Sequence, residues 1–233
     1  MGALEACRLL SIEEIVIENG MVRGLSADHT AAVLSTKCPD MFGPVGITRV
    51  GTLFSRLGAI LKSGGSVEVE VKPTTGEVFQ IVGRGKGSSI DFRCASAKKV
   101  KAPSEIDDEP ARALTFTQEE IASISQGTRM MGAKSFSLRR MNGRTTAKCM
   151  DPTGDVFTAT LVSDVVPFDV GAPTDFQEFR YRTESLLAPF KHMTAKDDTL
   201  PITAVMGDGG SLRFLVNGHE VVVLPENESS GEE

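Results

Sequence analysis

The sequence is poor in the residues that most often carry catalysis, metal binding or membrane insertion. Its 233 residues include no tryptophan, one tyrosine, three histidines and four cysteines. No run of 18 or more apolar residues occurs, so the sequence offers no membrane-spanning helix, and the N-terminus lacks the pattern of a secretory signal. The cysteines are far apart and form no Cys-x-x-Cys pair, which predicts reduced thiols rather than disulfides or a zinc site. We therefore expect a cytoplasmic protein with no membrane partner and no metal.

Catalytic motifs are also missing. His29, His192 and His219 stand in no HExxH pattern and near no GxSxG nucleophile motif. The segment GRGKGSS at 83–89 lacks the GxxxxGK[ST] spacing and lies between two predicted strands, so it is interpreted as a hairpin tip rather than a phosphate-binding loop. The carboxylate cluster DDEP at 107–110 is interpreted as a solvated charge run. The sequence therefore predicts neither an enzyme nor a cofactor.

Two segments about half a chain apart suggest an internal duplication. Both 18–35 and 141–161 are predicted to be hairpins, because each contains an Asn-Gly pair, the strongest short signal for a tight turn. In each copy an aspartate follows the glycine by eight positions. The glycines, Gly20 and Gly143, are 143 − 20 = 123 residues apart.

Helix and strand candidates repeat in the same order. Helices are predicted at 3–11, 49–62, 117–131 and 184–193, and runs of strands at 66–95 and 201–225. Thr117 and Glu120 form a capping box, and Pro189 is expected to kink or shorten the last helix. The fold class predicted is α+β: two tandem copies of one domain, each with antiparallel sheets covered on one face by two helices.

Composition shifts place the expected domain boundaries. A segment with two prolines, a basic start and an acidic middle lies at mid-chain, and the chain ends in an acidic stretch. We expect domain 1 at 1–95, an interdomain connector at 96–113, domain 2 at 114–225 and an acidic disordered tail at 226–233.

The helix predicted at 49–62 carries unneutralised positive charge. Its apolar residues would share one buried face: Val50, Leu53, Phe54, Leu57, Ile60 and Leu61. Arg49 and Arg56 differ by about 700° at 100° per residue, so they would project together, and the helix contains no carboxylate. Because the formal net charge of the chain is −6, this basic stripe suggests an anionic partner.

Taken together, these features resemble the sliding clamp of T4-like phages, a DNA polymerase processivity factor related in fold to the clamps of eukaryotes and archaea. The resemblance covers nearly the whole chain and rests on the order of the elements. It also rests on RVGTLFSRLGAIL as the second helix, on the proline-bearing connector, on GLSADHTAAVLS as two strands joined by an aspartate-containing turn, and on the ending EVVVLPENE.

The resemblance implies a homotrimeric closed ring, with helices lining the hole and sheets forming the outer wall. Such a ring encircles duplex DNA without sequence specificity, tethers the replicative DNA polymerase and is opened by a clamp loader ATPase. A phage-encoded clamp would act in the host cell cytoplasm. The residues implied to face DNA are Arg8, Arg49, Arg56, Lys62, Arg129, Lys134, Arg182 and Lys191. Those implied to form a pocket for partner peptides are Ala27, Asp28, Ile106, Val222, Leu224 and Pro225.

Other interpretations stay open at this point. The basic helix faces are also compatible with ordinary solvated faces, and Val222 and Leu224 with a plain last strand. The chain is also compatible with a homo-oligomeric scaffold of the same fold that is not threaded by DNA. A small hydrolase or transferase with an unrecognised site is the third hypothesis, and the missing acid–base and metal residues argue against it.

Overall fold

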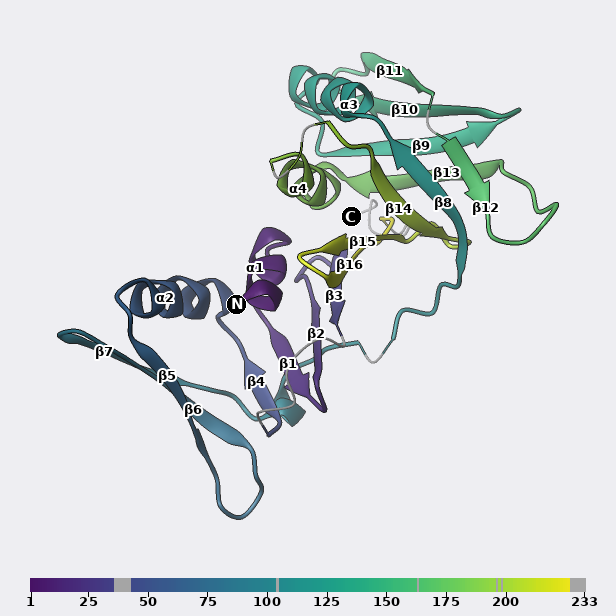
Figure 1. The fold of residues 1–233 in the computed structure, drawn as a ribbon. Helices are drawn as coiled ribbons and strands as arrows, with labels where there is room; N and C mark the ends of the chain where they lie inside the picture. The colour runs from purple at the N-terminus through teal and green to yellow at the C-terminus, as the bar shows by residue number, and fades with distance from the viewer. Residues whose placement is uncertain (36–42, 104, 163, 196, 198, 227–233) are drawn as a thin grey trace. The chain divides into compact units, whose positions relative to one another are not determined.

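A computed structural model describes residues 1–35, 43–103, 105–162, 164–195, 197 and 199–226 (Figure 1). The chain forms two compact units. Unit 1 comprises Met1–Ile106 with Asn217–Val221, and unit 2 comprises Asp107–Val216 with Val222–Glu233. The change from one unit to the other at 106/107 falls inside the predicted connector. Residues 227–233 of the predicted tail lie outside the described residues.

Unit 1 begins with a helix, continues through strands and a second helix, and ends in a three-stranded sheet. Its elements are α1 (Gly2–Leu9), β1 (Ile15–Glu18), β2 (Met21–Leu25), β3 (Ala31–Ser35), β4 (Val45–Ile47), α2 (Val50–Lys62), β5 (Ser66–Val71), β6 (Val78–Gly85), β7 (Ser88–Arg93) and the 3-10 helix η1 (Ala97–Lys99). The first four strands lie in the order β3-β2-β1-β4, and β5-β6-β7 form the second sheet. All pairs within these two sheets are antiparallel.

Unit 2 repeats this order with additions. Its elements are β8 (Pro110–Phe116), α3 (Gln118–Met130), β9 (Ser135–Met141), β10 (Arg144–Met150), β11 (Val156–Leu161), β12 (Asp164–Pro167), β13 (Phe176–Arg182), α4 (Thr183–Thr194), β14 (Ile202–Gly207) and β15 (Leu212–Val216). The last strand, β16 (His219–Val223), contributes residues to both units. One sheet has the order β11-β10-β9-β13 and a second contains β12-β8-β14-β15.

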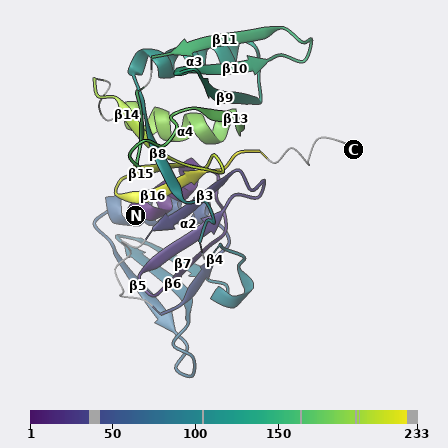
Figure 2. The same cartoon turned by 90° about the vertical axis from the view of Figure 1, so that its right-hand side faces the viewer.

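The duplication predicted from the Asn-Gly pairs is present in the topology. The order β3-β2-β1-β4 in unit 1 matches β11-β10-β9-β13 in unit 2, and a helix precedes and follows each set. In unit 2, α3 packs against β10 and β11 and α4 packs against β13, so both helices cover one face of the sheet (Figure 2). The α+β fold class is therefore confirmed.

Turn chemistry explains the hairpins. Asn19, Asn142 and Asn217 each have a φ of 52° to 54°, and each is followed by a glycine of positive φ. These are the torsions of the tight hairpin turn in which both central residues have positive φ. The repeated aspartates organise the next turn in each unit: Asp28 Oδ1 accepts hydrogen bonds from the amide and hydroxyl of Thr30, and Asp151 Oδ1 from those of Thr153.

Helix ends follow the sequence in α3 and α4 but not in α2. The predicted capping box is formed, with the Thr117 side chain accepting from the Glu120 amide and the Glu120 carboxylate accepting from the Thr117 amide. Helix α4 runs from Thr183 to Thr194 through the buried Pro189, so this proline does not shorten the helix. At α2 the cap comes from outside the helix, because the Glu13 carboxylate accepts a hydrogen bond of 3.2 Å from the Gly51 amide.

The mid-chain carboxylate cluster differs from the solvated run that was predicted. Asp108 is half-buried in unit 2, where its carboxylate accepts hydrogen bonds from the amides of Gly209 (2.7 Å) and Ser211 (2.8 Å). Its carbonyl oxygen accepts a third, of 2.6 Å, from Arg213. Asp108 therefore fixes the glycine-rich turn between β14 and β15, a contact between residues about 100 positions apart that the local sequence does not reveal.

The core of unit 1 includes a thiol that titrates far from its ordinary range. Cys7 is fully buried on α1, and burial raises the pKa of its thiol from 9.0 to about 12. The unfolded chain releases this proton from about pH 9, whereas the folded chain keeps it until about pH 12, so the folded state binds more protons in between. The stabilising contribution is therefore complete below pH 9 and is lost as the pH rises from 9 to 12.

We accordingly expect the free energy of unfolding to fall more steeply above pH 9 in the wild type than in Cys7→Ala. Urea unfolding of both proteins at pH 8, 9 and 10 measures this, because other titrating groups cancel in the difference. A difference that stays constant over this range would show that Cys7 does not carry the effect.

Candidate nucleic-acid interface

The basic residues predicted on the helices of unit 1 are held in two different ways. Arg8 on α1 and Arg49 before α2 both pack on aromatic rings: their guanidinium carbons lie 4.9 Å from the centroid of Phe54 and 5.0 Å from that of Phe92. Arg49 is the N-cap residue of α2, with φ −148° and ψ 64°. Because Arg49 does not have helical torsions, its predicted projection beside Arg56 is wrong.

Arg56 and Lys62 lie on the exposed side of α2. Neither side chain forms an ion pair among the described residues, and Lys62 lies in the last helical turn, where the helix dipole favours a cation. The Glu13 carboxylate, which accepts from the Gly51 amide, lies at the opposite end of α2. Positive charge at Arg56 and Lys62 is thus available to an anion from solvent.

In unit 2, four of the predicted residues line one hollow. Arg129 at the end of α3, Lys134 in the following loop, and Arg182 and Lys191 at α4 border a cavity of about 380 Å³. The loop and the helix are tied together because the Thr183 amide donates to the Lys134 carbonyl (2.8 Å) and the Thr183 hydroxyl to the Ala133 carbonyl (2.9 Å).

The electrostatics of this hollow suit a polyanion. Its lining contains four cations and one carboxylate, Glu184, together with the hydroxyl-bearing residues Ser125, Thr128 and Thr183. No aromatic side chain belongs to the lining, so stacking on bases has no partner here. Guanidinium, ammonium and hydroxyl groups can contact phosphate oxygens without reading bases, which is a sequence-independent mode of binding.

The residues predicted to form a partner pocket lie at the ends of elements. Ala27 and Asp28 are exposed in the turn between β2 and β3, where Asp28 also accepts a hydrogen bond of 2.6 Å from Ser26 Oγ. Ile106 is half-buried at the end of unit 1. Val222 is buried in β16, and Leu224 and Pro225 are half-buried after it. Their role in binding stays a prediction.

His219 and His29 each lie in the local structure of unit 1. His219 Nδ1 lies 2.7 Å from Ser35 Oγ, within unit 1, and His29 is exposed in the turn after Asp28 with a φ of 59°. Among the described residues, no group of three or more His, Cys, Asp or Glu side chains is arranged to hold a metal ion. In the same part of the chain, no helix has both the length and the apolar composition to cross a membrane.

Comparison with known proteins shows the fold. No family model matches the sequence, and no curated protein matches it. The solved structures it resembles include the proliferating cellular nuclear antigen (PCNA) of Entamoeba histolytica, at a TM-score of 0.58 and 13% identity, covering 96% of this chain and 93% of that one. The pol III beta protein of Caulobacter crescentus gives a TM-score of 0.64 at 14% identity, covering 94% of this chain and 59% of that one.

A third likeness is to A. fulgidus PCNA, solved with the C-terminal region of FEN-1 bound, at a TM-score of 0.57 and 13% identity, covering 97% of this chain and 94% of that one. The chain thus spans nearly the full length of both PCNA chains but about three fifths of the bacterial one. At these identities the likeness establishes the fold alone, and that fold is the one shared by PCNA and the bacterial sliding clamps.

Proposed function

We propose that the protein is a DNA sliding clamp that encircles duplex DNA without sequence specificity and tethers a replicative DNA polymerase. The observation that carries this proposal is the set of basic residues on the helices of a clamp fold, above all the four that border one hollow in unit 2. Diffuse phosphate contacts hold a duplex without fixing its register, which suits a protein that must slide.

The ring would consist of three copies of this chain. This chain has two related units and covers 93% of a PCNA chain but 59% of the Caulobacter beta chain. A chain about one and a half times as long would hold three such units, so three copies of this chain supply as many units as two copies of the longer one. Helices of every unit would face the DNA, and Arg8, Arg49, Arg56, Lys62, Arg129, Lys134, Arg182 and Lys191 would supply the phosphate contacts.

Partners would bind by short peptides. The A. fulgidus PCNA was solved with a C-terminal region of FEN-1 bound, and we infer that this chain accepts comparable segments near Ala27, Asp28, Ile106, Val222, Leu224 and Pro225. A clamp loader ATPase would open the ring. A T4-like phage origin belongs to the same proposal and rests on the sequence resemblance alone.

The mass in solution tests the ring directly. Sedimentation equilibrium over a wide concentration range is expected to show a species of about 75 kDa, three times the 24.9 kDa of one chain, with dissociation on dilution. A monomer at every concentration would exclude encirclement. A trimer that stimulates no polymerase and is not retained on circular DNA would instead indicate the homo-oligomeric scaffold.

A further inference from the structure

The sheet β11-β10-β9-β13 of unit 2 carries a row of cations on the face opposite α3 and α4. Phe136, Ala147 and Cys149 alternate as buried residues toward the helices, and the residues between them point the other way. On that outer side stand Arg139, Arg144, Lys148 and Arg180, which we call the basic sheet face.

Little of this charge is neutralised within the described residues. Arg139 donates to the Met141 sulfur at 3.6 Å and Arg144 to the Thr160 hydroxyl at 3.1 Å, and neither forms an ion pair there, nor does Lys148. Arg180 pairs with Glu226 at 3.1 Å. Because the net charge of the chain is −6, this local concentration of positive charge indicates a surface that attracts an anionic partner.

The duplicate unit shows that the fold does not require these cations. With the offset of 123, Arg139, Arg144 and Lys148 correspond to Val16, Met21 and Leu25 of unit 1. All three counterparts are apolar, although the strand order around them is the same. These three cations therefore have no counterpart in unit 1, where the Arg23 on the same face of β2 is paired with Glu18.

In unit 1 a segment of the chain itself, from Ala95 through the 3-10 helix η1 to Val100, packs on β4 and β1 at the equivalent place. Ala95 and Gly46 exchange backbone hydrogen bonds of 2.8 and 3.0 Å, and Val100 is buried. A Cβ added at Gly46 would lie 2.8 Å from the Val100 side chain, which shows how closely that segment packs on β4. A segment that joins the sheet edge through one backbone pair and packs one apolar side chain on it thus occupies this place in unit 1.

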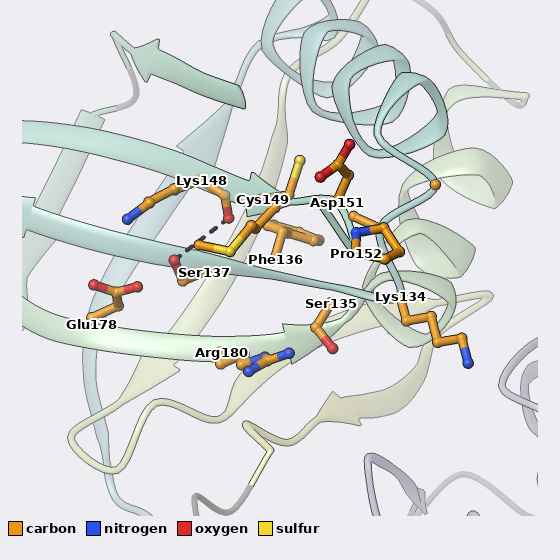
Figure 3. Close-up of a pocket in the computed structure, with 13 residues that line it drawn as sticks. Lys134, Ser135, Phe136, Ser137, Lys148, Cys149, Asp151, Pro152, Glu178 and Arg180 are labelled. Atoms are coloured by element: carbon orange, nitrogen blue, oxygen red, sulfur yellow. Dashed lines mark hydrogen bonds between the residues drawn. The ribbon is translucent and has the colours of Figure 1, made fainter. Parts of the chain in front are cut away.

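In unit 2 the equivalent place is a hollow of about 470 Å³ (Figure 3). In unit 2 Phe179 pairs with Leu138, and at the equivalent position of unit 1 Ile47 pairs with Ile15. Glu178, which precedes Phe179, therefore corresponds to Gly46, and it lines the hollow. The apolar part of the lining includes the exposed Met150 and Pro152, and the cations are Lys134, Lys148 and Arg180, beside the carboxylates of Asp151 and Glu178.

The structure already places one acidic residue at the edge of this face. The Glu226 amide donates to the Arg180 carbonyl at 2.7 Å, while its carboxylate pairs with the Arg180 guanidinium. Backbone pairing with β13 and charge pairing with the basic sheet face are thus compatible in a single residue.

We propose that the basic sheet face and its hollow bind an extended acidic peptide of a partner protein, with one apolar side chain lying against Met150 and Pro152. A nucleic acid fits less well, because its phosphates make no use of the apolar side chains of Met150 and Pro152 or of backbone pairing with β13. The site lies within unit 2, so it does not depend on the proposed ring or on DNA.

Fluorescence anisotropy with the full chain tests this proposal. The probe is a labelled ten-residue peptide of glutamates with one central leucine, and its matched partner has glycine in place of leucine. We expect the triple variant Arg139→Glu, Arg144→Glu, Lys148→Glu to bind the leucine peptide at least tenfold more weakly. The control triple variant Arg56→Glu, Arg129→Glu, Lys191→Glu, with the same charge change, is expected to stay within twofold of wild type.

Each alternative result overturns part or all of the proposal. Equal loss of peptide binding in both triple variants would show that net charge, and not the basic sheet face, determines the affinity. Equal affinity for the leucine and glycine peptides would exclude the hollow as a side-chain pocket. A labelled 20-nucleotide oligothymidine that binds tighter than the peptide, and only with the basic sheet face intact, would assign the surface to nucleic acid instead.

Discussion

The triple variant Arg56→Glu, Arg129→Glu, Lys191→Glu is expected to lose retention on circular DNA almost completely while still assembling. Each reversal removes a cation available to a phosphate and adds a repulsive charge, and a trimer multiplies the change to nine sites. Each phosphate contact contributes a slope of about −0.9 to the dependence of log affinity on log salt, so losing several contacts costs orders of magnitude. We expect the half-life on nicked circular DNA at about 0.1 M salt to shorten by at least tenfold, and polymerase processivity to fall with it.

The variant of the basic sheet face, Arg139→Glu, Arg144→Glu, Lys148→Glu, is the matched control for this experiment. It carries the same change in net charge on the other side of the sheet, and its DNA retention is expected to stay within twofold of wild type. Intact retention in the helix variant would show that the helices do not face DNA. Sedimentation of both variants shows whether each still assembles. A variant that assembles but is not retained has lost DNA contacts rather than assembly.

Replacing Asp108 by alanine is expected to destabilise unit 2 by about 2–4 kcal/mol. The substitution leaves the amides of Gly209 and Ser211 without their acceptor, and hydrogen bonds to a charged group contribute about 1.5–3 kcal/mol each. The space left is partly accessible to water, which recovers some of the loss. Urea unfolding measures the effect as a lower midpoint for the transition of unit 2.

Asp107→Ala is the control for Asp108→Ala. Asp107 is exposed, and its replacement removes the same charge one residue earlier in the chain. Its unfolding free energy is expected to change by less than about 0.5 kcal/mol. Equal effects of the two substitutions would mean that Asp108 acts only through the charge of the connector, as the sequence pattern had suggested.

Features fixed by a few neighbouring residues could be predicted. The Asn-Gly turns and the Thr117–Glu120 box depend on contacts within four residues, so their patterns are visible in the sequence. The duplication followed from the spacing of two such turns. The order of helices and strands along each half followed from the helical and alternating patterns, and the α+β fold class that it predicted is confirmed.

Features that depend on distant pairing could not be predicted. The segment at 165–182 divides between two sheets in the structure: β12 pairs with β8, and β13 pairs with β9. Likewise Glu13 caps a helix 38 residues away. A short run of alternating residues does not reveal its partner strand, because many strands in the chain offer the same pattern.

The exposure of single candidate residues could be predicted, but their grouping around one cavity could not. The helical period correctly placed Arg56 and Lys191 on exposed sides, yet nothing in the sequence indicated that Arg129, Lys134, Arg182 and Lys191 border one cavity. The basic sheet face could not be predicted from the sequence, for a related reason. Its cations alternate with buried residues on neighbouring strands, and only the pairing register places them side by side.

The division of β16 between the two units has a consequence for protein synthesis. Unit 1 includes residues Asn217–Val221, which are made 217 − 106 = 111 residues after the rest of that unit is complete. At about 5–20 residues per second, a ribosome takes roughly 6–22 seconds to supply them. Until then β3 has no neighbour on its outer side, and the nascent chain exposes an open strand edge that other chains can pair with. Chaperone binding or pausing during this interval would protect the newly made first unit from aggregation.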